Sequence, residues 1–372
     1  MYHGANGFEI HNSLTIVRGY ALCDMDNDFS NYMIDVINKG SLSIMLSVGH
    51  RTKLFDILST LPPSSAKEIA LKAKLNERYV REWLGAMVTG KIIEYDSVKD
   101  KFWFTKEKSQ YLTRENNIYN FAASMQWIPI LSQVEDEIVE CFKKGGGVPY
   151  SSYKRFHEVM AEESYQTVVV GLIDHILPLI PNLVADLENG IRVLDIGCGK
   201  GKAVNLMAKH FPKSIFHGYD LSKEAIDGAT KEGKEMNNSN VVFKVQDILD
   251  SSLKNEFDLV TAFDAIHDQP KPDLVLKNIN QSLSDKGVFL MQDILASTPL
   301  KDNISHPLGT FLYTISCMHC MSVSLSQNGA GLGAMWGKEK ALSMLKEAGF
   351  VNVQVKTLPH DFQNYYYCAY KD

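Results

Sequence analysis

Residues 191–222 constrain the fold more strongly than any other stretch of the chain. Val193, Leu194 and Ile196 form a short apolar run that is typical of a strand buried in a parallel sheet. Glycines at positions 197, 199 and 201 follow, and glycine lets the backbone turn tightly and approach a ligand without a Cβ in the way. The pattern predicts a strand, a glycine-rich turn and a helix, which form one half of a nucleotide-binding βαβ unit.

A second strand is predicted over residues 214–219, and Asp220 follows at its carboxyl end. Ligands of open α/β sheets bind at this end of the strands, where an acid can accept hydrogen bonds from both ribose hydroxyls. The glycine spacing distinguishes a dinucleotide from other nucleotide cofactors. The dinucleotide pattern G-x-G-x-x-G would require a glycine at position 202, where this chain has Lys202, and the third glycine comes one residue earlier. Asp195 precedes the first glycine by two residues. Its carboxylate would repel a pyrophosphate but suits the cationic amino-acid end of S-adenosylmethionine.

The order D-x-G-x-G-x-G, followed by an acid that closes the next strand, resembles class I S-adenosylmethionine-dependent methyltransferases. The resemblance implies an α/β fold with a Rossmann-like, doubly wound sheet, S-adenosyl-L-methionine as the cofactor and S-adenosyl-L-homocysteine as the product. It also implies a set of cofactor-binding residues: Asp195, Gly197, Gly199, Gly201, Asp220, Leu221, Asp247, Ile248 and Phe263. In this set Asp247 would bond the adenine amino group, although a polar residue at a strand end is equally explained as a helix cap or turn former.

From residue 191 onward, strand and helix signals alternate, which predicts a doubly wound parallel sheet. Strands are expected near residues 191, 215, 241, 257 and 286, and helices near residues 203, 223 and 273. The alternation breaks over residues 296–336, and an insertion of this length in a compact domain usually has a function. The final expected elements are a helix over 338–348 and strands over 351–357 and 364–370.

Residues 31–110 carry the signals of an α-helical winged helix-turn-helix domain. Ser65 and Glu68 have the spacing of a capping box, and Asn76 is a good N-cap for a helix that Gly90 ends. The expected elements are a helical stretch, two shorter helices and a hairpin, over residues 32–61, 67–75, 77–90, 92–95 and 102–104.

The charge of this domain argues against DNA binding. Residues 41–100 hold nine Lys/Arg and seven Asp/Glu, and the whole chain has a net charge of −6. The predicted recognition helix carries a balanced, self-pairing set of charges: Glu77, Arg78, Arg81 and Glu82. A helix face with balanced charges of this kind does not follow the phosphate backbone of DNA. We therefore expect no nucleic-acid partner, and a domain that dimerises the protein and covers the active site.

His267 and Asp268 are the expected catalytic residues. They follow the fourth predicted strand and resemble the His-Asp pair of two-domain small-molecule O-methyltransferases, in which the histidine is the general base. Those enzymes have an aromatic residue next, whereas Gln269 and Pro270 follow here. The structural alternative is a histidine that caps the helix starting after Pro270.

Three further segments resemble a narrower branch of winged-helix methyltransferases: ERYVREWL at 77–84, HCMSVSL at 319–325 and GLGAMWG at 331–337. From this resemblance we expect the insertion to form the acceptor pocket. Its expected lining residues are Met318, His319, Met321, Met335 and Trp336. Methionines at helical spacing also fit plain core packing.

The cysteines predict no metal or redox site. Cys317 and Cys320 have C-x-x-C spacing, but structural zinc takes four ligands and no second pair is in view. Six scattered cysteines suggest reduced thiols in the cytoplasm. The N-terminus does not resemble a secretory signal, and no apolar run approaches the roughly 20 residues of a membrane span, so we expect no membrane partner.

The expected organisation is an N-terminal arm (1–30), a winged-helix dimerisation domain (31–110), a helical linker (111–185) and a class I methyltransferase domain (186–372). The expected function is methylation of an oxygen or nitrogen of a small-molecule acceptor by a cytoplasmic homodimer. Three alternatives stay open: a nicotinamide oxidoreductase, which shares the βαβ unit; a winged-helix DNA-binding regulator; and a methyltransferase-like protein that binds the cofactor without catalysis.

Overall fold

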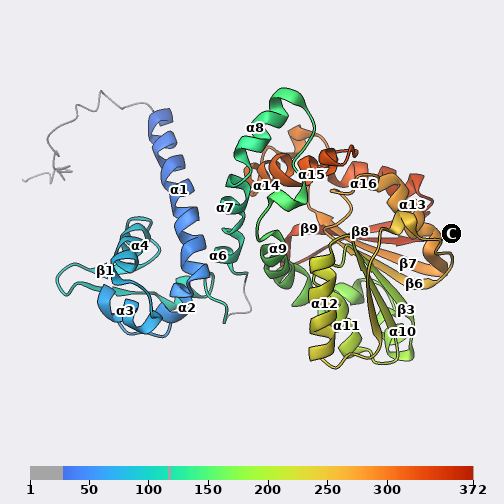
Figure 1. Cartoon of the computed structure of the whole chain (residues 1–372), viewed down its shortest axis with the longest axis horizontal. Coiled ribbons are helices and arrows are strands. Elements are labelled where there is room, and N and C mark those ends of the chain that lie inside the picture. The colour runs from blue at the N-terminus through green and yellow to red at the C-terminus, as the bar shows by residue number, and fades with distance from the viewer. Residues whose placement is uncertain (1–27, 116–118, 372) are drawn as a thin grey trace, which may run out of the picture.

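The computed structural model describes residues 28–115 and 119–371 (Figure 1). All but the last three residues of the expected N-terminal arm, 1–30, lie outside these ranges. The first part of the described chain is mainly helical and contains α1 (Asp28–Arg51), α2 (Leu54–Leu58), α3 (Ala66–Ala73), α4 (Glu77–Thr89), β1 (Glu94–Asp96), β2 (Lys101–Trp103) and α5 (Lys106–Ser109). β1 and β2 pair antiparallel, and this hairpin completes the expected winged helix with the preceding helices.

Local signals explain most of these boundaries. Both halves of the Ser65–Glu68 capping box are formed at α3, and the Asn76 side chain accepts a hydrogen bond from the Arg78 N–H at the start of α4. The expected helical stretch 32–61 is two helices instead of one, because Lys53 adopts a left-handed φ of 60° that an α-helix cannot contain.

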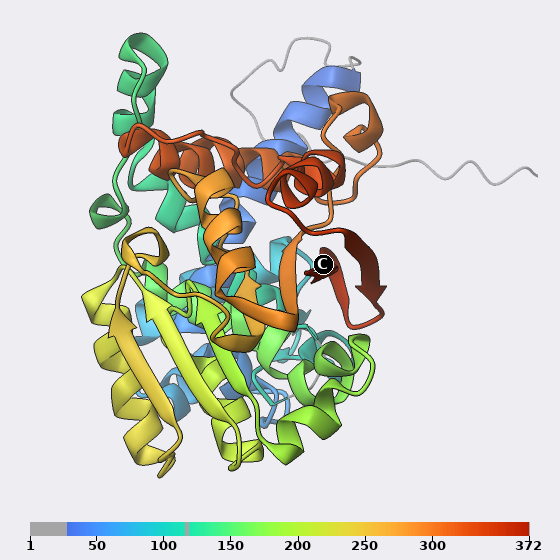
Figure 2. The same cartoon turned by 90° about the vertical axis from the view of Figure 1, so that its right-hand side faces the viewer.

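A segment of short helices connects this domain to the sheet. Its elements are α6 (Phe121–Ser124), α7 (Trp127–Ser132), α8 (Glu135–Lys144), the 3₁₀ turn η1 (Tyr150–Ser152), α9 (Phe156–Ser164), the π-helical turns η2 (Tyr165–Val169) and η3 (Leu172–Ile176), the 3₁₀ turn η4 (Leu177–Leu179) and α10 (Leu183–Asn189). Figure 1 shows α6, α7 and α9 between the blue N-terminal domain and the sheet, and Figure 2 shows the blue domain behind the sheet domain.

We call residues 145–155 the strap, because they cross from α8 to the edge of the sheet domain. Gly145 and Gly146 have φ of 73° and 82°, which lets the chain turn sharply after α8. Gly147 then packs so closely that a Cβ there would lie 1.8 Å from the backbone oxygen of Ser322. The Val148 N–H donates to Ser322 Oγ at 2.8 Å, so the strap is fastened just beyond its glycines.

The C-terminal half contains a seven-stranded sheet in the order β5-β4-β3-β6-β7-β9-β8. Its strands are β3 (Arg192–Ile196), β4 (Ile215–Asp220), β5 (Val241–Val245), β6 (Phe257–Phe263), β7 (Leu283–Ile294), β8 (Asn352–Leu358) and β9 (Asp361–Tyr370). The first five run parallel, and β9 runs antiparallel between β7 and β8. The chain winds outward from β3 to β5 and then returns to β6, so the switch point lies between β3 and β6.

Helices cover both faces of the sheet and make a three-layered α/β/α domain. The covering helices are α10, α11 (Lys202–His210) and α12 (Lys223–Glu235) on one face, and α13 (Pro272–Ser282) and α16 (Gly337–Glu347) on the other. Leu187, Met207 and Phe216 belong to the first core, and Leu276, Phe289 and Leu345 to the second. The doubly wound sheet and its five parallel strands confirm the predicted fold.

The insertion over residues 296–336 folds into η6 (Leu300–Asn303), α14 (Gly309–Ile315), the π-helical turn η7 (Ser316–Cys320) and α15 (Met321–Ser326). It packs against the linker helices, where Val323 shares a core with Trp127 and Ile130. Among the helices in the described ranges, none combines the length and apolar character that a membrane span requires.

Candidate active site

A cavity of about 880 Å³ opens at the carboxyl ends of the parallel strands, at the switch point of the sheet. One wall is formed by the loops that follow β3, β4, β5 and β6, and the other by residues 150–169 of the strap, α9 and η2. Of the predicted cofactor-binding residues, those that line it are Asp195, Gly197, Gly199, Asp220, Leu221, Asp247, Ile248 and Phe263.

The glycine turn after β3 has the backbone that its sequence predicts. Gly197, Gly199 and Gly201 have φ of 70°, 51° and 66°. Gly199 donates its N–H to Asp220 Oδ2 at 2.9 Å, so the turn and the end of β4 hold each other. Gly201 does not line the cavity: a Cβ there would lie 2.7 Å from Ala229, so this glycine serves the packing of α11 against α12.

Asp195 is a buried carboxylate at the base of the cavity. Thr261 donates a hydrogen bond to its Oδ1 at 2.6 Å. Burial raises the pKa of Asp195 to about 7, although the Thr261 hydrogen bond opposes the shift. A cationic group brought next to this carboxylate would be bound strongly, because it would relieve the cost of burying the charge.

Asp247 caps a turn and also lines the cavity. Its Oδ1 accepts the Leu249 N–H at 2.8 Å and caps the short turn η5 (Ile248–Asp250). The same residue lines the cavity, so capping holds the carboxyl group in place at the rim of the site.

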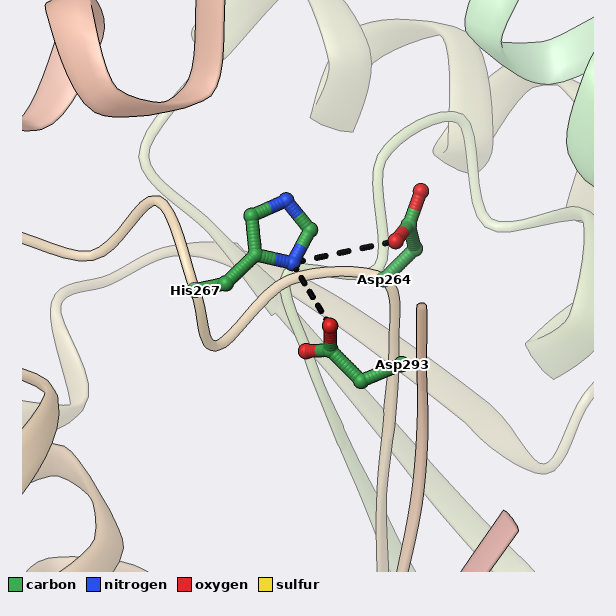
Figure 3. A group of neighbouring side chains, drawn as sticks. All are labelled: Asp264, His267 and Asp293. Carbon is green, nitrogen blue, oxygen red and sulfur yellow. Dashed lines mark hydrogen bonds and ion pairs between the residues drawn. The ribbon is translucent and has the colours of Figure 1, made fainter. Parts of the chain in front are cut away.

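His267 lies behind the cavity wall in a buried ionic cluster (Figure 3). Its Nδ1 is 2.9 Å from Asp293 Oδ1 and 3.8 Å from Asp264 Oδ1. Burial lowers the pKa of His267, but Asp293 outweighs this and raises that pKa well above its usual value. A pKa shifted in this direction favours the protonated ring, which pairs with Asp293. His267 caps no helix, because α13 begins without any side-chain cap.

Asp264, His267 and Asp293 place one potential ligand atom each within 4.8 Å of one another. Two carboxylates and an imidazole are a donor set that can hold a divalent cation. The direct His267–Asp293 hydrogen bond already balances the charges of that pair, so we interpret the group as an ion-pair cluster.

Asp268, unlike His267, lines the cavity. The Tyr150 hydroxyl of the strap donates a hydrogen bond to Asp268 Oδ2. Tyr150 and Phe156 lie edge to face with ring centres 5.4 Å apart, and both line the cavity opposite the strand ends. The strap thus supplies an aromatic wall that faces the loop after β6.

Two family models match this chain. Residues 40–114 match the Rv2258c-like winged HTH domain, and residues 187–349 match a methyltransferase domain. The chain joins a winged helix-turn-helix domain to a class I methyltransferase domain. S-adenosylmethionine is the cofactor of this class of domain, and solved neighbours contain it or its product.

The solved neighbours share the fold of both domains. Human N-acetylserotonin methyltransferase in complex with SAM has a TM-score of 0.67 at 17% identity, over 94% of this chain and 99% of that chain. PigF with SAH has a TM-score of 0.61 at 17% identity, over 92% and 99%. Among curated proteins, (S)-coclaurine N-methyltransferase of Papaver somniferum is 30% identical over 114 residues. That match spans 31% of this chain and only 32% of the relative.

The residues predicted to line the acceptor pocket lie outside the lining of this cavity. None of the five insertion residues is among those that line the cavity: Met318, His319, Met321, Met335 and Trp336. The rings of His319 and Phe156 stack with their centres 4.4 Å apart. Trp336 Nε1 donates a hydrogen bond to Asp293 Oδ1 at 2.9 Å. Met318 contributes its carbonyl oxygen to the Tyr153 hydroxyl at 2.6 Å, while Met335 is a core residue. The insertion packs against the wall formed by residues 150–169, and its residue Gln327 lines the cavity.

Sequence reasoning missed the wall from residues 150–169. The only signal was the close spacing of Tyr150, Tyr153 and Phe156 ahead of a helix, which marks a packed face without saying what it packs on. The C-x-x-C cysteines, Cys317 and Cys320, are free thiols and belong to no cluster of potential metal ligands in the described part of the chain.

Proposed function

We propose that this protein transfers the methyl group of S-adenosylmethionine to an oxygen or nitrogen atom of a small molecule and releases S-adenosylhomocysteine. The observation that carries the proposal is the cavity at the switch point, into which three carboxylates from three successive strand ends face: Asp195, Asp220 and Asp247. The cofactor supplies an electrophilic methyl carbon on a sulfonium, so the protein has to bind, align and exclude water.

The residues present fit this cofactor. Asp195 is a buried carboxylate with a raised pKa, which suits the ammonium of the amino-acid end. Asp220, fixed by the N–H groups of Gly199 and Ser222, would take the ribose hydroxyls. Asp247 would take the adenine amino group, with Leu221 and Ile248 against the ring and Phe263 near the reacting end.

Of the predicted catalytic pair, we assign contact with the acceptor to Asp268 and a positioning role to His267. Asp268 lines the cavity, whereas His267 is buried outside its lining and its Nδ1 is paired with Asp293. A protonated ring cannot accept a proton, but it fixes the loop after β6 through its ion pair with Asp293. Alignment supplies most of the rate in such a transfer.

We further propose a homodimer in the cytoplasm, formed through the winged-helix domain of residues 31–110. The support is a stripe of exposed apolar side chains on α1: Met33, Ile37, Ile44 and Val48. Arg78 pairs with Glu82, and Arg81 with Glu77, on the exposed face of α4, so this surface offers no free cations for a DNA backbone.

Calorimetric titration with S-adenosylhomocysteine, with NAD as the control, tests the function. We expect micromolar binding of S-adenosylhomocysteine alone. Asp220→Asn should weaken it about tenfold or more, because hydrogen bonds to a charged acceptor contribute about 1.5–3 kcal/mol. Asp227→Asn, in an exposed pair with Lys223 on α12, is the matched control and should leave binding unchanged. Binding of NAD in place of S-adenosylhomocysteine would refute the proposal.

A further inference from the structure

The part of the cavity between the loop after β6 and the strap is acidic and aromatic. The loop after β6 contributes two carboxylates to it, Asp264 and Asp268, and no Lys or Arg. The basic side chains that line the cavity come from the strap and the glycine turn instead: Lys154, Arg155, Lys200 and Lys202. Two of these are already paired, Arg155 with Glu158 at 2.8 Å and Lys202 with Glu232 at 2.8 Å. The loop therefore faces the cavity with an excess of negative charge.

The positive charge of His267 is shared among three carboxylates, because this side chain lies near Asp264 and Asp268 and also pairs with Asp293. Asp264 Oδ1 is buried and accepts no hydrogen bond in the described part of the chain, and the ring nitrogen 3.8 Å away is committed to Asp293 at 2.9 Å. Figure 3 shows the second oxygen of Asp264 directed away from the His267 ring. Asp268 accepts a hydrogen bond from the neutral Tyr150 hydroxyl. Both carboxyl groups are half-buried, and a carboxylate withdrawn from water is costly unless a cation pairs with it.

Their surroundings also suit a cation with a carbon skeleton. Tyr150 and Phe156 line the same cavity, and Tyr150 is in direct contact with Asp268. Aromatic faces attract ammonium groups as well as apolar carbon. Burial raises the pKa of both carboxyls, to about 7 for Asp264, and the nearby His267, which lowers both pKa values, does not offset the burial.

We propose that the methyl acceptor is a basic amine that binds as an ammonium ion, with its charge between Asp264 and Asp268 and its carbon skeleton against Tyr150 and Phe156. This inference rests on the proposed methyltransferase function and narrows its substrate class. A carboxylic acid acceptor would meet two like charges here, and a neutral alcohol or phenol would leave the excess negative charge of this loop unpaired.

The proton and electron balance of the transfer follows from this placement. The bound ammonium gives one proton to the Asp264 carboxylate, which leaves a lone pair on nitrogen. That lone pair forms the new nitrogen–carbon bond while the carbon–sulfur bond breaks and its electrons stay on sulfur. The products are a methylated ammonium ion and the neutral thioether. Asp264 then returns its proton to solvent.

Three matched probes separate the charge of the acceptor from its shape: phenethylamine, 2-phenylethanol and phenylacetate. Each is titrated calorimetrically into the full chain saturated with S-adenosylhomocysteine at pH 8. We expect the amine to bind at least tenfold more tightly than the alcohol, and phenylacetate not to bind. Asp268→Asn should reduce amine affinity at least tenfold, to the level of the alcohol, while Asp227→Asn leaves it unchanged.

A titration over pH 6 to 8 gives a second readout that needs no variant. Asp264 faces His267, Asp268, Asp293 and Asp361, and its raised pKa means that it loses charge as the pH falls below about 7. Amine affinity should therefore weaken on acidification, whereas alcohol affinity should not.

The outcomes distinguish this inference from the function on which it rests. If S-adenosylhomocysteine binds but the alcohol binds as well as the amine, or no amine binds at millimolar concentration, the acceptor class is wrong and the function stands. If Asp268→Asn binds S-adenosylhomocysteine normally and keeps the amine preference, the assigned binding residues are wrong. If S-adenosylhomocysteine itself does not bind, both proposals fall together.

Discussion

At the scale of single residues, the burial of Asp195 links cofactor binding to pH. Its pKa is raised to about 7, and only the ionised carboxylate attracts an ammonium. Binding of S-adenosylhomocysteine should therefore be about tenfold tighter at pH 8 than at pH 6, which calorimetry at the two pH values measures. Asp195→Asn should bind weakly at both. Equal affinity of the natural protein at both values would contradict the assignment.

In the protein without a ligand, the raised pKa of Asp195 makes the fold less stable as the pH rises, whereas it makes ligand binding tighter. A carboxyl whose pKa is raised from 3.8 to about 7 in the folded state stabilises the fold most at low pH, below its unfolded value. That contribution is lost as the pH rises through about 7, when the buried group ionises. A bound cation offsets this loss of stability, because it pairs with the ionised carboxylate of Asp195. Near neutral pH, Asp195 therefore destabilises the empty protein and stabilises the complex.

At the scale of elements, the strap is held by the contact of Gly147 with Ser322. Gly147→Ala would place a Cβ 1.8 Å from a backbone oxygen, and backbone cannot move aside as a flexible side chain can. We expect a loss of stability of about 1–3 kcal/mol, seen as a lower midpoint of thermal unfolding. Gly85→Ala on α4, where a Cβ meets nothing within 4 Å, is the control and should stabilise slightly. An unchanged midpoint for Gly147→Ala would show that the strap is loosely attached.

The elements also show which parts of the structure a sequence can predict. Ser65, Glu68 and Asn76 form hydrogen bonds with backbone groups two or three residues away, so the starts of α3 and α4 could be predicted from local sequence. The glycine turn and the strand ends followed for the same reason. The Tyr150–Asp268 contact joins residues 118 positions apart, and no local pattern encodes that distance. The cavity wall formed by residues 150–169 was therefore not predicted, and neither were the π-helical turns after α9.

At the scale of the whole molecule, α1 is the surface that most needs a partner. Its N-terminal half projects away from the rest of the described chain in Figure 1, and Ile37 in its apolar stripe is 66% exposed. Ile37→Glu should convert a dimer into a monomer in sedimentation velocity, because a charge would be buried in the interface. Asn38→Glu adds the same charge on an exposed neighbouring position and should leave the dimer intact. A natural protein that sediments as a monomer would refute the dimer.

The position of β9 has a consequence for the synthesis of the protein on the ribosome. β9 is formed by residues 361–370, yet it pairs with both β7 and β8 and buries Tyr366, Tyr367, Cys368 and Ala369. Until these residues emerge from the exit tunnel, β7 keeps an open, apolar edge and β8 has no strand to join. A nascent chain that stalls before this point carries an almost complete cofactor site on an unfinished sheet, and is a natural client for chaperones.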